Sequence, residues 1–158
     1  MVADEGVVPT SSQVQAFTIE QVAAQTGLTK RTLRYYEEVG LLPPTGRTEG
    51  NYRRYTQDDL QRLERVKNLR NLLGFSLADI RTILEAEDER QQIKVAYSQE
   101  TEASSKIAQL DHADEIIQRQ LELIEQKIAG LEQMRSTLLE KLEGHERKRQ
   151  NLQQDKYT

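Results

Sequence analysis

From Ile107 to Leu142 the sequence repeats apolar residues at alternating steps of three and four. This spacing puts the apolar side chains on one side of a helix and is typical of a coiled-coil seam. Two positions of the pattern are polar instead, and these are Asp114 and Arg135. We therefore predict a long coiled-coil helix over residues 104–143, with a seam formed by Ile107, Leu110, Asp114, Ile117, Leu121, Ile124, Ile128, Leu131, Arg135, Leu138 and Leu142.

The rest of the chain has room for one small domain. Of 158 residues, 36% are hydrophobic and 30% are charged, which is too polar for one large core but suits a small core joined to a long solvated helix. The absence of cysteine excludes disulfides, thiolate metal sites and thiol redox chemistry. No signal-peptide pattern and no apolar run of about 20 residues occurs, so we expect a soluble, cytoplasmic protein.

Two short helices are predicted after a disordered N-terminal tail of residues 1–16. Thr18, followed three residues later by Gln21, has the pattern of a capping box, and Gly27 ends this first helix. Thr29 is a suitable N-cap for a second helix, which Gly40 closes. Two short helices joined by a tight turn that contains glycine form a helix-turn-helix candidate.

Further elements follow in order along the chain. The segment 46–56 alternates around Glu49, Gly50 and Asn51, which predicts a small hairpin or wing. A third helix begins near Asp58, and Ser76 opens a fourth that ends near residue 86. Residues 87–103 are interpreted as a hinge and residues 144–158 as a polar C-terminal tail. The domain with the predicted wing spans residues 17–86.

The second predicted helix has one apolar face and one basic face. Leu33 and Tyr36 share the first face, and the other carries Lys30, Arg31, Arg34 and Tyr35. A basic face of this kind is often only solvated. Within residues 29–55, however, six cations stand against three acids, although the whole chain has a net charge of −4. The second helix of a helix-turn-helix enters the DNA major groove, where Arg and Lys side chains reach guanine edges or phosphates.

The segment from Phe17 to Leu84 closely resembles the DNA-binding domain of the MerR family of bacterial transcription regulators. Three motifs carry the resemblance in the right order: TLRYYEEVGLL, NYRRYT and GFSLADI. The resemblance implies a mainly α fold, with a winged helix-turn-helix domain followed by a long antiparallel coiled-coil helix that forms a homodimer. It also implies binding to a palindromic promoter whose overlong spacer is bent and untwisted, so that RNA polymerase can use it.

The same resemblance implies a set of DNA contacts. Matching positions on the recognition helix and the wing are Thr29, Arg31, Arg34, Tyr35, Tyr52 and Arg53, with Arg47 and Arg54 as further wing contacts. Arg70, late in the third helix, matches a position directed at phosphate, or it is simply a solvated residue. The commoner family order Asn-Gly-Tyr-Arg is replaced by Gly-Asn-Tyr-Arg at residues 50–53, which leaves the turn type open.

No sensor site or catalytic site follows from the sequence. His112 and His145 lie about 50 Å apart on one predicted helix, so we expect no metal site and no cofactor. The only aromatic residues outside the DNA-binding half are Tyr97 and Tyr157. Two tyrosines do not form an aromatic pocket for an effector, so the effector stays unidentified. No phosphate loop or catalytic set is present, so the chain is not expected to be an enzyme. The alternative is a coiled-coil adaptor whose winged helix binds protein.

The two polar seam residues are mirror images of each other in an antiparallel pair. The numbers of Asp114 and Arg135 add up to 249, as do those of the end residues Ile107 and Leu142. Asp114 of one helix is therefore predicted to lie near Arg135 of the other. Alternatively, each side chain reaches solvent independently of the other.

Overall fold

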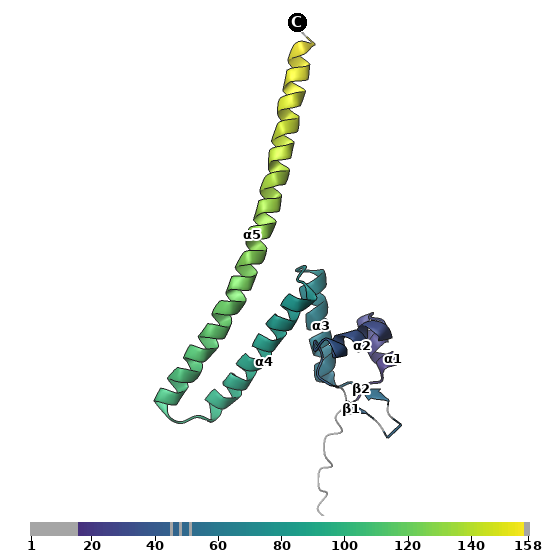
Figure 1. Cartoon of the computed structure of the whole chain (residues 1–158), viewed down its shortest axis with the longest axis vertical. Helices are drawn as coiled ribbons and strands as arrows, with labels where there is room; N and C mark the ends of the chain where they lie inside the picture. Colours follow the sequence, from purple (N-terminus) through teal and green to yellow (C-terminus); the bar gives the residue numbers. More distant parts are fainter. Residues whose placement is uncertain (1–15, 45, 48, 51, 157–158) are drawn as a thin grey trace, which may run out of the picture. The chain divides into compact units, whose positions relative to one another are not determined.

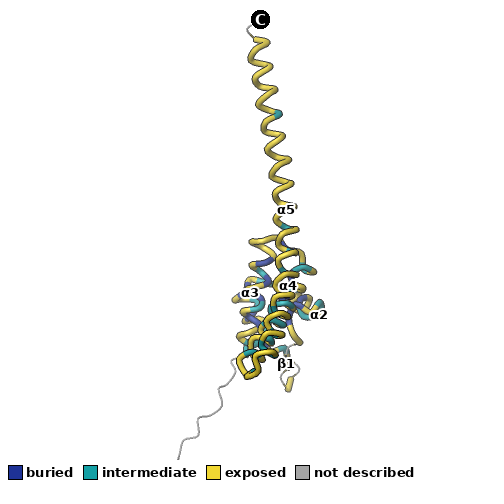
Figure 2. The backbone as a smooth tube through the Cα atoms, turned by 90° about the vertical axis from the view of Figure 1, so that its left-hand side faces the viewer, coloured by how far each residue is buried: buried dark blue, intermediate teal, exposed yellow. Residues whose placement is uncertain are grey.

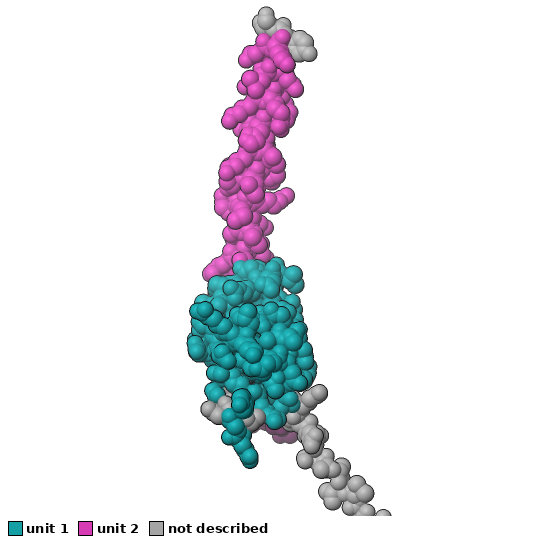
Figure 3. All heavy atoms as spheres, turned by 90° about the vertical axis from the view of Figure 1, so that its right-hand side faces the viewer, with its two compact units in different colours: residues 1–84 teal, residues 85–158 magenta. Residues whose placement is uncertain are grey.

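The computed structural model describes residues 16–44, 46, 47, 49, 50 and 52–156. Apart from Ala16, the predicted N-terminal tail lies outside these residues. The chain divides into two compact units, one up to Leu84 and one from Glu85 onward (Figure 3). The helices α1 to α5 follow in chain order, with a small wing of two strands after α2 (Figure 1).

The first two helices begin and end at the predicted signals. Helix α1 spans Ile19–Thr26, and its N-cap Thr18 forms the predicted capping box with Gln21. Gly27 adopts the left-handed conformation at φ 72°, a region that costs other L residues energy. Helix α2 spans Lys30–Glu38, and the Thr29 side chain accepts a hydrogen bond of 3.1 Å from the amide of Thr32. The predicted helix-turn-helix is therefore confirmed.

The predicted wing is an antiparallel pair of short strands. Strand β1 is Gly46–Arg47 and strand β2 is Arg53–Arg54, with Arg47 opposite Arg53. Asn51, part of the predicted turn, lies outside the described residues. One contact was not predicted: the backbones of Phe17 and Tyr55 exchange two hydrogen bonds, of 2.7 and 2.9 Å. They attach the start of the domain to the end of the wing.

Helices α3 and α4 complete the core of the first unit. Helix α3 is Gln57–Asn71, and α4 begins at Leu77 after Ser76, whose hydroxyl accepts from the amide of Asp79 at 3.1 Å. Apolar side chains at helical spacing point inward, as expected for small helical domains. The buried apolar residues of this unit are Val22, Leu33, Tyr36, Leu41, Leu42, Tyr55, Leu60, Leu63, Val66, Leu69, Phe75, Ile80, Ile83 and Leu84.

The hinge prediction for residues 87–103 is wrong over most of its length. Helix α4 runs from Leu77 to Gln99, and only residues 100–102 interrupt the helix before α5. These three residues are held by the Glu100 carboxylate, which accepts hydrogen bonds from the amides of Thr101 and Glu102 at 2.8 and 2.9 Å. These backbone hydrogen bonds lower the pKa of Glu100. Few of residues 86–102 are apolar, so the sequence has no helical apolar pattern there that would predict this part of α4.

Contacts with α5 explain why this polar stretch is helical. Helix α5 turns back beside the second half of α4 (Figure 1). The Lys106 ammonium lies 4.8 Å from the centre of the Tyr97 ring, and His112 Nε2 lies 2.9 Å from a carboxylate oxygen of Glu89. Tertiary packing supplies most helical stability in proteins, and here it includes polar as well as apolar contacts.

Helix α5 spans Ala103–Asp155 and therefore extends past the predicted end at residue 143. The tail prediction for residues 144–158 is wrong up to Asp155. This stretch is rich in Glu, Arg, Lys and Gln, which are good helix formers. An ion pair of 3.0 Å between Arg149 and Glu146, three residues apart, supports it further.

Most of α5 has no partner surface within the described chain. Ile116 is the one buried apolar side chain that the described part of the second unit contains, and the rest of the helix is largely exposed (Figure 2). The apolar seam residues are 37–60% exposed. No helix among the described residues is apolar and long enough to span a membrane.

Candidate DNA-binding interface

Helix α2 separates its buried and exposed side chains as the sequence predicts. Leu33 and Tyr36 are 0% and 2% exposed and pack into the core, while Tyr35 is 48% exposed. Arg31 and Arg34 are exposed as well. A hollow of about 520 Å³ on this outer face is lined by Arg31, Thr32, Arg34, Tyr35 and Glu38. The face presents cations and a phenol hydroxyl to solvent.

The cations of this face differ in their bonding. Arg31 and Arg34 make no hydrogen bond or ion pair with the described residues, so their guanidinium groups are available to a ligand. Lys30 contacts Glu20 of α1 at 2.8 Å, and this hydrogen bond lowers the pKa of Glu20. Exposed ion pairs of this kind contribute little to stability, so a phosphate can replace Glu20 as the partner of Lys30. Thr29 is occupied as the N-cap of α2.

Arg53 braces the wing against α2. Its Nε lies 2.8 Å from a carboxylate oxygen of Glu37, and the two side chains are only 24% and 17% exposed. The family resemblance implies a DNA contact for Arg53, whereas in the structure its Nε is bonded to Glu37. The pair joins residues far apart in sequence, which no local pattern reveals.

The other predicted wing residues face outward. Tyr52 is 74% exposed, and Arg47 and Arg54 are exposed too. Arg54 makes no hydrogen bond or ion pair with any described residue. In addition to Arg53, which is bonded to Glu37, the wing therefore presents one phenol and two guanidinium groups on its surface.

Arg70 is bonded within the domain. Its Nη1 donates a hydrogen bond of 3.0 Å to the hydroxyl of the buried Tyr36. This contact joins the last turn of α3 to the last turn of α2. It differs from both sequence interpretations, a phosphate contact and a purely solvated side chain, because one of its nitrogens already has a protein partner.

Tyr55 is a residue of the interface region that the sequence analysis did not single out. Its side chain is fully buried, and its hydroxyl has no hydrogen-bond partner among the residues that the structure describes. Burial, with a further contribution from the nearby Glu37 carboxylate, raises the pKa of Tyr55, because both disfavour a phenolate. The hydroxyl thus stays neutral close to Arg53 and Arg34.

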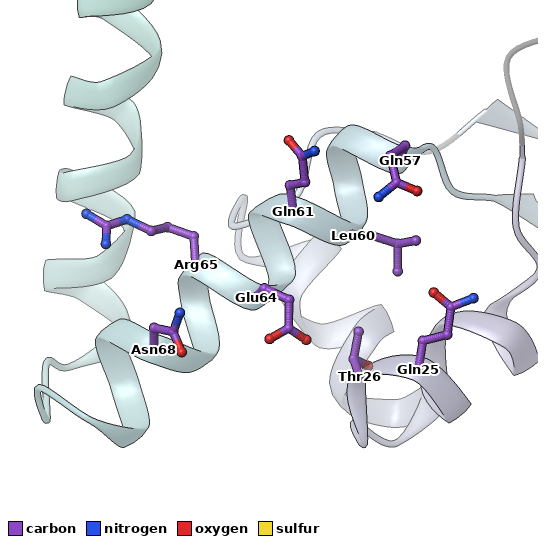
Figure 4. A pocket seen from close by; sticks show the side chains of 8 residues that line it. All are labelled: Gln25, Thr26, Gln57, Leu60, Gln61, Glu64, Arg65 and Asn68. Atoms are coloured by element: carbon purple, nitrogen blue, oxygen red, sulfur yellow. The ribbon is translucent and has the colours of Figure 1, made fainter.

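A second hollow lies between the end of α1 and α3 (Figure 4). Its volume is about 430 Å³, and carboxamide side chains predominate in its wall, formed by Gln25, Thr26, Gln57, Leu60, Gln61, Glu64, Arg65 and Asn68. None of the residues predicted to contact DNA lines it. The cationic face of α2 and the wing therefore form the candidate interface without this hollow.

Comparisons with known proteins agree on the nature of the first unit. Residues 17–87 match the family model described as MerR HTH family regulatory protein. The HTH-type transcriptional regulator YfmP of Bacillus subtilis is 37% identical over 120 residues, which cover 76% of this chain and 86% of that protein. ZntR of Escherichia coli K12, also an HTH-type transcriptional regulator, is 34% identical over 77% of this chain and 75% of its own length.

A likeness to a solved structure extends over both units. A MerR family transcriptional regulator from Listeria monocytogenes matches with a TM-score of 0.52 and 22% identity, covering 82% of this chain and 86% of that one. At this identity the likeness concerns the fold alone.

Proposed function

The chain belongs to the MerR family of helix-turn-helix transcriptional regulators, and we propose that it binds a palindromic promoter site as a homodimer. Regulators of this family bind DNA through the helix-turn-helix. In the proposed mechanism α2 of each copy enters a major groove, and the wings contact the flanking phosphates. Bending and untwisting of an overlong promoter spacer then makes the promoter usable by RNA polymerase.

The observation that carries the DNA-binding proposal is the outer face of α2. Arg31 and Arg34 are exposed and unbonded to described residues, next to the exposed hydroxyl of Tyr35. Arginine guanidinium groups pair with guanine acceptors and with phosphates. Thr29, Lys30, Arg47, Tyr52 and Arg54 would add backbone contacts around this centre. We assign Arg53 and Arg70 primarily to holding α2, with any phosphate contact secondary.

The homodimer is supported by the exposed stripe on α5. Nine apolar seam residues from Ile107 to Leu142 are each at least 37% exposed. A continuous apolar stripe of this length is unfavourable in water and marks an interaction surface. The heptad spacing suits a second helix with the same spacing, which a second copy of the chain supplies.

DNA distortion fits a rigid dimer. In the proposed dimer, two DNA-binding units are joined by a stiff pair of helices at a fixed separation. Both units bind their half-sites only if the duplex adapts to that separation. Smooth bending of a site costs on the order of 1–6 kcal/mol, and additional phosphate contacts offset that cost. A promoter with an overlong spacer would gain its usable geometry from this deformation.

The test of DNA binding is a salt titration by fluorescence anisotropy with duplex from the promoter next to the gene. For the wild type we expect a steep fall of the association constant with salt, as phosphate neutralisation requires. Arg31→Ala and Arg34→Ala should each lose about 1–3 kcal/mol of binding. Arg119→Ala is the matched control, because Arg119 is an exposed arginine of α5 outside the proposed interface.

Two outcomes would contradict the proposal. Unchanged affinity in both α2 variants would remove DNA binding from this face. A flat salt dependence with random and promoter duplex alike would favour the alternative, an adaptor whose winged helix binds protein, which has no need of unbonded arginines on α2.

A further inference from the structure

Two charged residues interrupt the apolar stripe of α5. Asp114 and Arg135 occupy seam positions, are exposed, and make no hydrogen bond or ion pair with any described residue. They stand 21 residues apart, which is three heptads, so both lie along the same edge of the stripe. Each is a charge placed where a partner helix would cover it.

The charge pattern along that edge is unequal. Between Ile107 and Leu142 the neighbouring flank carries the acids Asp111, Glu125 and Glu132 and no cation. Arg135 is thus the sole cation at this edge of the described stripe. In a dimer, Arg135 therefore gains an opposite charge across the seam only where the partner helix places a carboxylate beside it.

Helix direction decides what Arg135 meets in a dimer. In a parallel pair each residue lies beside its own counterpart, so Arg135 would meet Arg135 and Asp114 would meet Asp114. In an antiparallel pair centred on the stripe, equivalent edges of the two helices run side by side, and Arg135 of one copy comes level with Asp114 of the other. The arginine side chain is long enough to reach Asp114 from there.

We infer that Asp114 of one copy pairs with Arg135 of the other, twice per dimer, and that this pairing selects the antiparallel orientation and its register. The inference rests on the proposed homodimer. A partly buried ion pair roughly offsets its own desolvation, so its main effect is to exclude wrong arrangements rather than to add stability. An exposed stripe of Ile and Leu alone would not discriminate between the two directions.

A charge-swap series measured by analytical ultracentrifugation tests the contact. Asp114→Arg and Arg135→Asp each place like charges together, and each should weaken the dimer by about tenfold or more, in the range of couplings between contacting residues. The double variant restores opposite charges and should recover to within about threefold of the wild type. The control double variant Arg119→Asp with Glu122→Arg lies on the exposed side away from the seam and should leave dimerisation unchanged.

Orientation is measured separately by spin labels. The chain has no native cysteine, so Glu140→Cys provides a unique labelling site on the outer side of α5. At 1.5 Å per residue, the two labels should lie about 45 Å apart in the antiparallel dimer. A parallel pair would bring them to about 20 Å, roughly one pair of helix diameters. Replacing both charges, Asp114→Leu with Arg135→Leu, should give a mixture of the two distances.

The outcomes separate this inference from the proposed function. If the double charge swap shows only the sum of the two single defects, or if the leucine variant keeps the long distance alone, the pairing is wrong while dimer and DNA binding stand. If the labelled wild type shows the short distance, the antiparallel pairing is wrong. A wild type that is monomeric at all concentrations would overturn the dimer itself, together with this inference.

Discussion

At the scale of single residues, Arg53 and Arg70 show how α2 is held in place. Arg53 of β2 bonds to Glu37, and Arg70 of α3 bonds to the hydroxyl of Tyr36. Arg31 and Arg34 on the outer face of α2, in contrast, make no hydrogen bond or ion pair with the described residues and remain available to a ligand. Some cations of this basic region therefore position the interface, while others form it.

Neighbouring arginines of the wing provide a matched pair of variants. Arg53→Ala removes one partner of the largely buried Glu37 carboxylate and should lower the free energy of unfolding by about 1–2 kcal/mol. Arg54→Ala removes an exposed side chain and should change it by less than about 0.5 kcal/mol. Urea denaturation measures both. Equal stabilities of the two variants would mean that the ion pair between Arg53 and Glu37 does not hold the wing against α2.

Tyr55 predicts a dependence of stability on alkaline pH. Its pKa in the folded protein is raised above the ordinary value of 10.0. Above that ordinary value the unfolded chain loses the proton while the folded chain retains it, so the free energy of unfolding falls as pH rises. Tyr55→Phe also removes an unsatisfied buried hydroxyl, and replacing it costs little at neutral pH.

The measurement compares urea denaturation of the wild type and Tyr55→Phe at pH 7 and at pH 10.5. Other tyrosines and lysines titrate in both proteins, so the difference between them isolates Tyr55. We expect the wild type to lose more stability between the two pH values than the variant does. Identical losses would show that Tyr55 titrates normally in the folded protein.

At the scale of elements, α5 is a long helix that is weakly supported by its own chain. It has 53 residues, one buried apolar side chain among those described, and two glycines in its interior, Gly130 and Gly144. A Cβ at either glycine would meet no atom within 4 Å. Intrinsic helix preference, together with the proposed pairing with a second copy of α5, is therefore expected to provide its stability.

Gly130→Ala should stabilise α5. Alanine restricts the unfolded chain and favours helix by about 0.5–1 kcal/mol relative to glycine. Gly27→Ala is the opposite control, because Gly27 at φ 72° needs the left-handed conformation and alanine should destabilise the domain by about 1 kcal/mol or more. Thermal unfolding followed by circular dichroism tests both. Destabilisation by Gly130→Ala would contradict an open, unstrained helix at that position.

At the scale of the whole molecule, the two units divide the work of the proposed regulator. The first unit has a complete small core and carries the candidate DNA interface. The second unit has almost no core of its own and carries the exposed stripe. In the proposed dimer, a fixed distance between the two DNA-binding units would force the bound duplex to bend. A flexible link between the two units would let the duplex stay straight.

The mechanism predicts how transcription responds to spacer length. Shortening the spacer of the regulated promoter by about two base pairs should make transcription independent of the protein, because the duplex then needs no distortion. In vitro transcription with and without the protein measures this. Continued dependence on the protein at the shortened promoter would indicate recruitment of polymerase or simple repression instead.

Local patterns in the sequence determined the helix starts and the two faces of α2. Capping residues such as Thr18, Thr29 and Thr56 act on amides within three residues, so their effect can be predicted without the fold. The heptad spacing likewise predicted the apolar stripe of α5, and the family motifs identified the DNA-binding unit. The exposure of the stripe agrees with that prediction, whereas the homodimer itself remains a proposal.

Only the tertiary structure decided how far α4 and α5 extend and which cations remain unbonded. Residues 87–99 lack an apolar pattern strong enough to predict a helix, and contacts such as Lys106 with Tyr97 hold them in one. Arg53 and Arg54 are adjacent and chemically identical, yet one is bonded to Glu37, 16 residues away, and the other faces solvent. Pairings across that separation depend on how the elements pack, which residue type and local spacing do not specify.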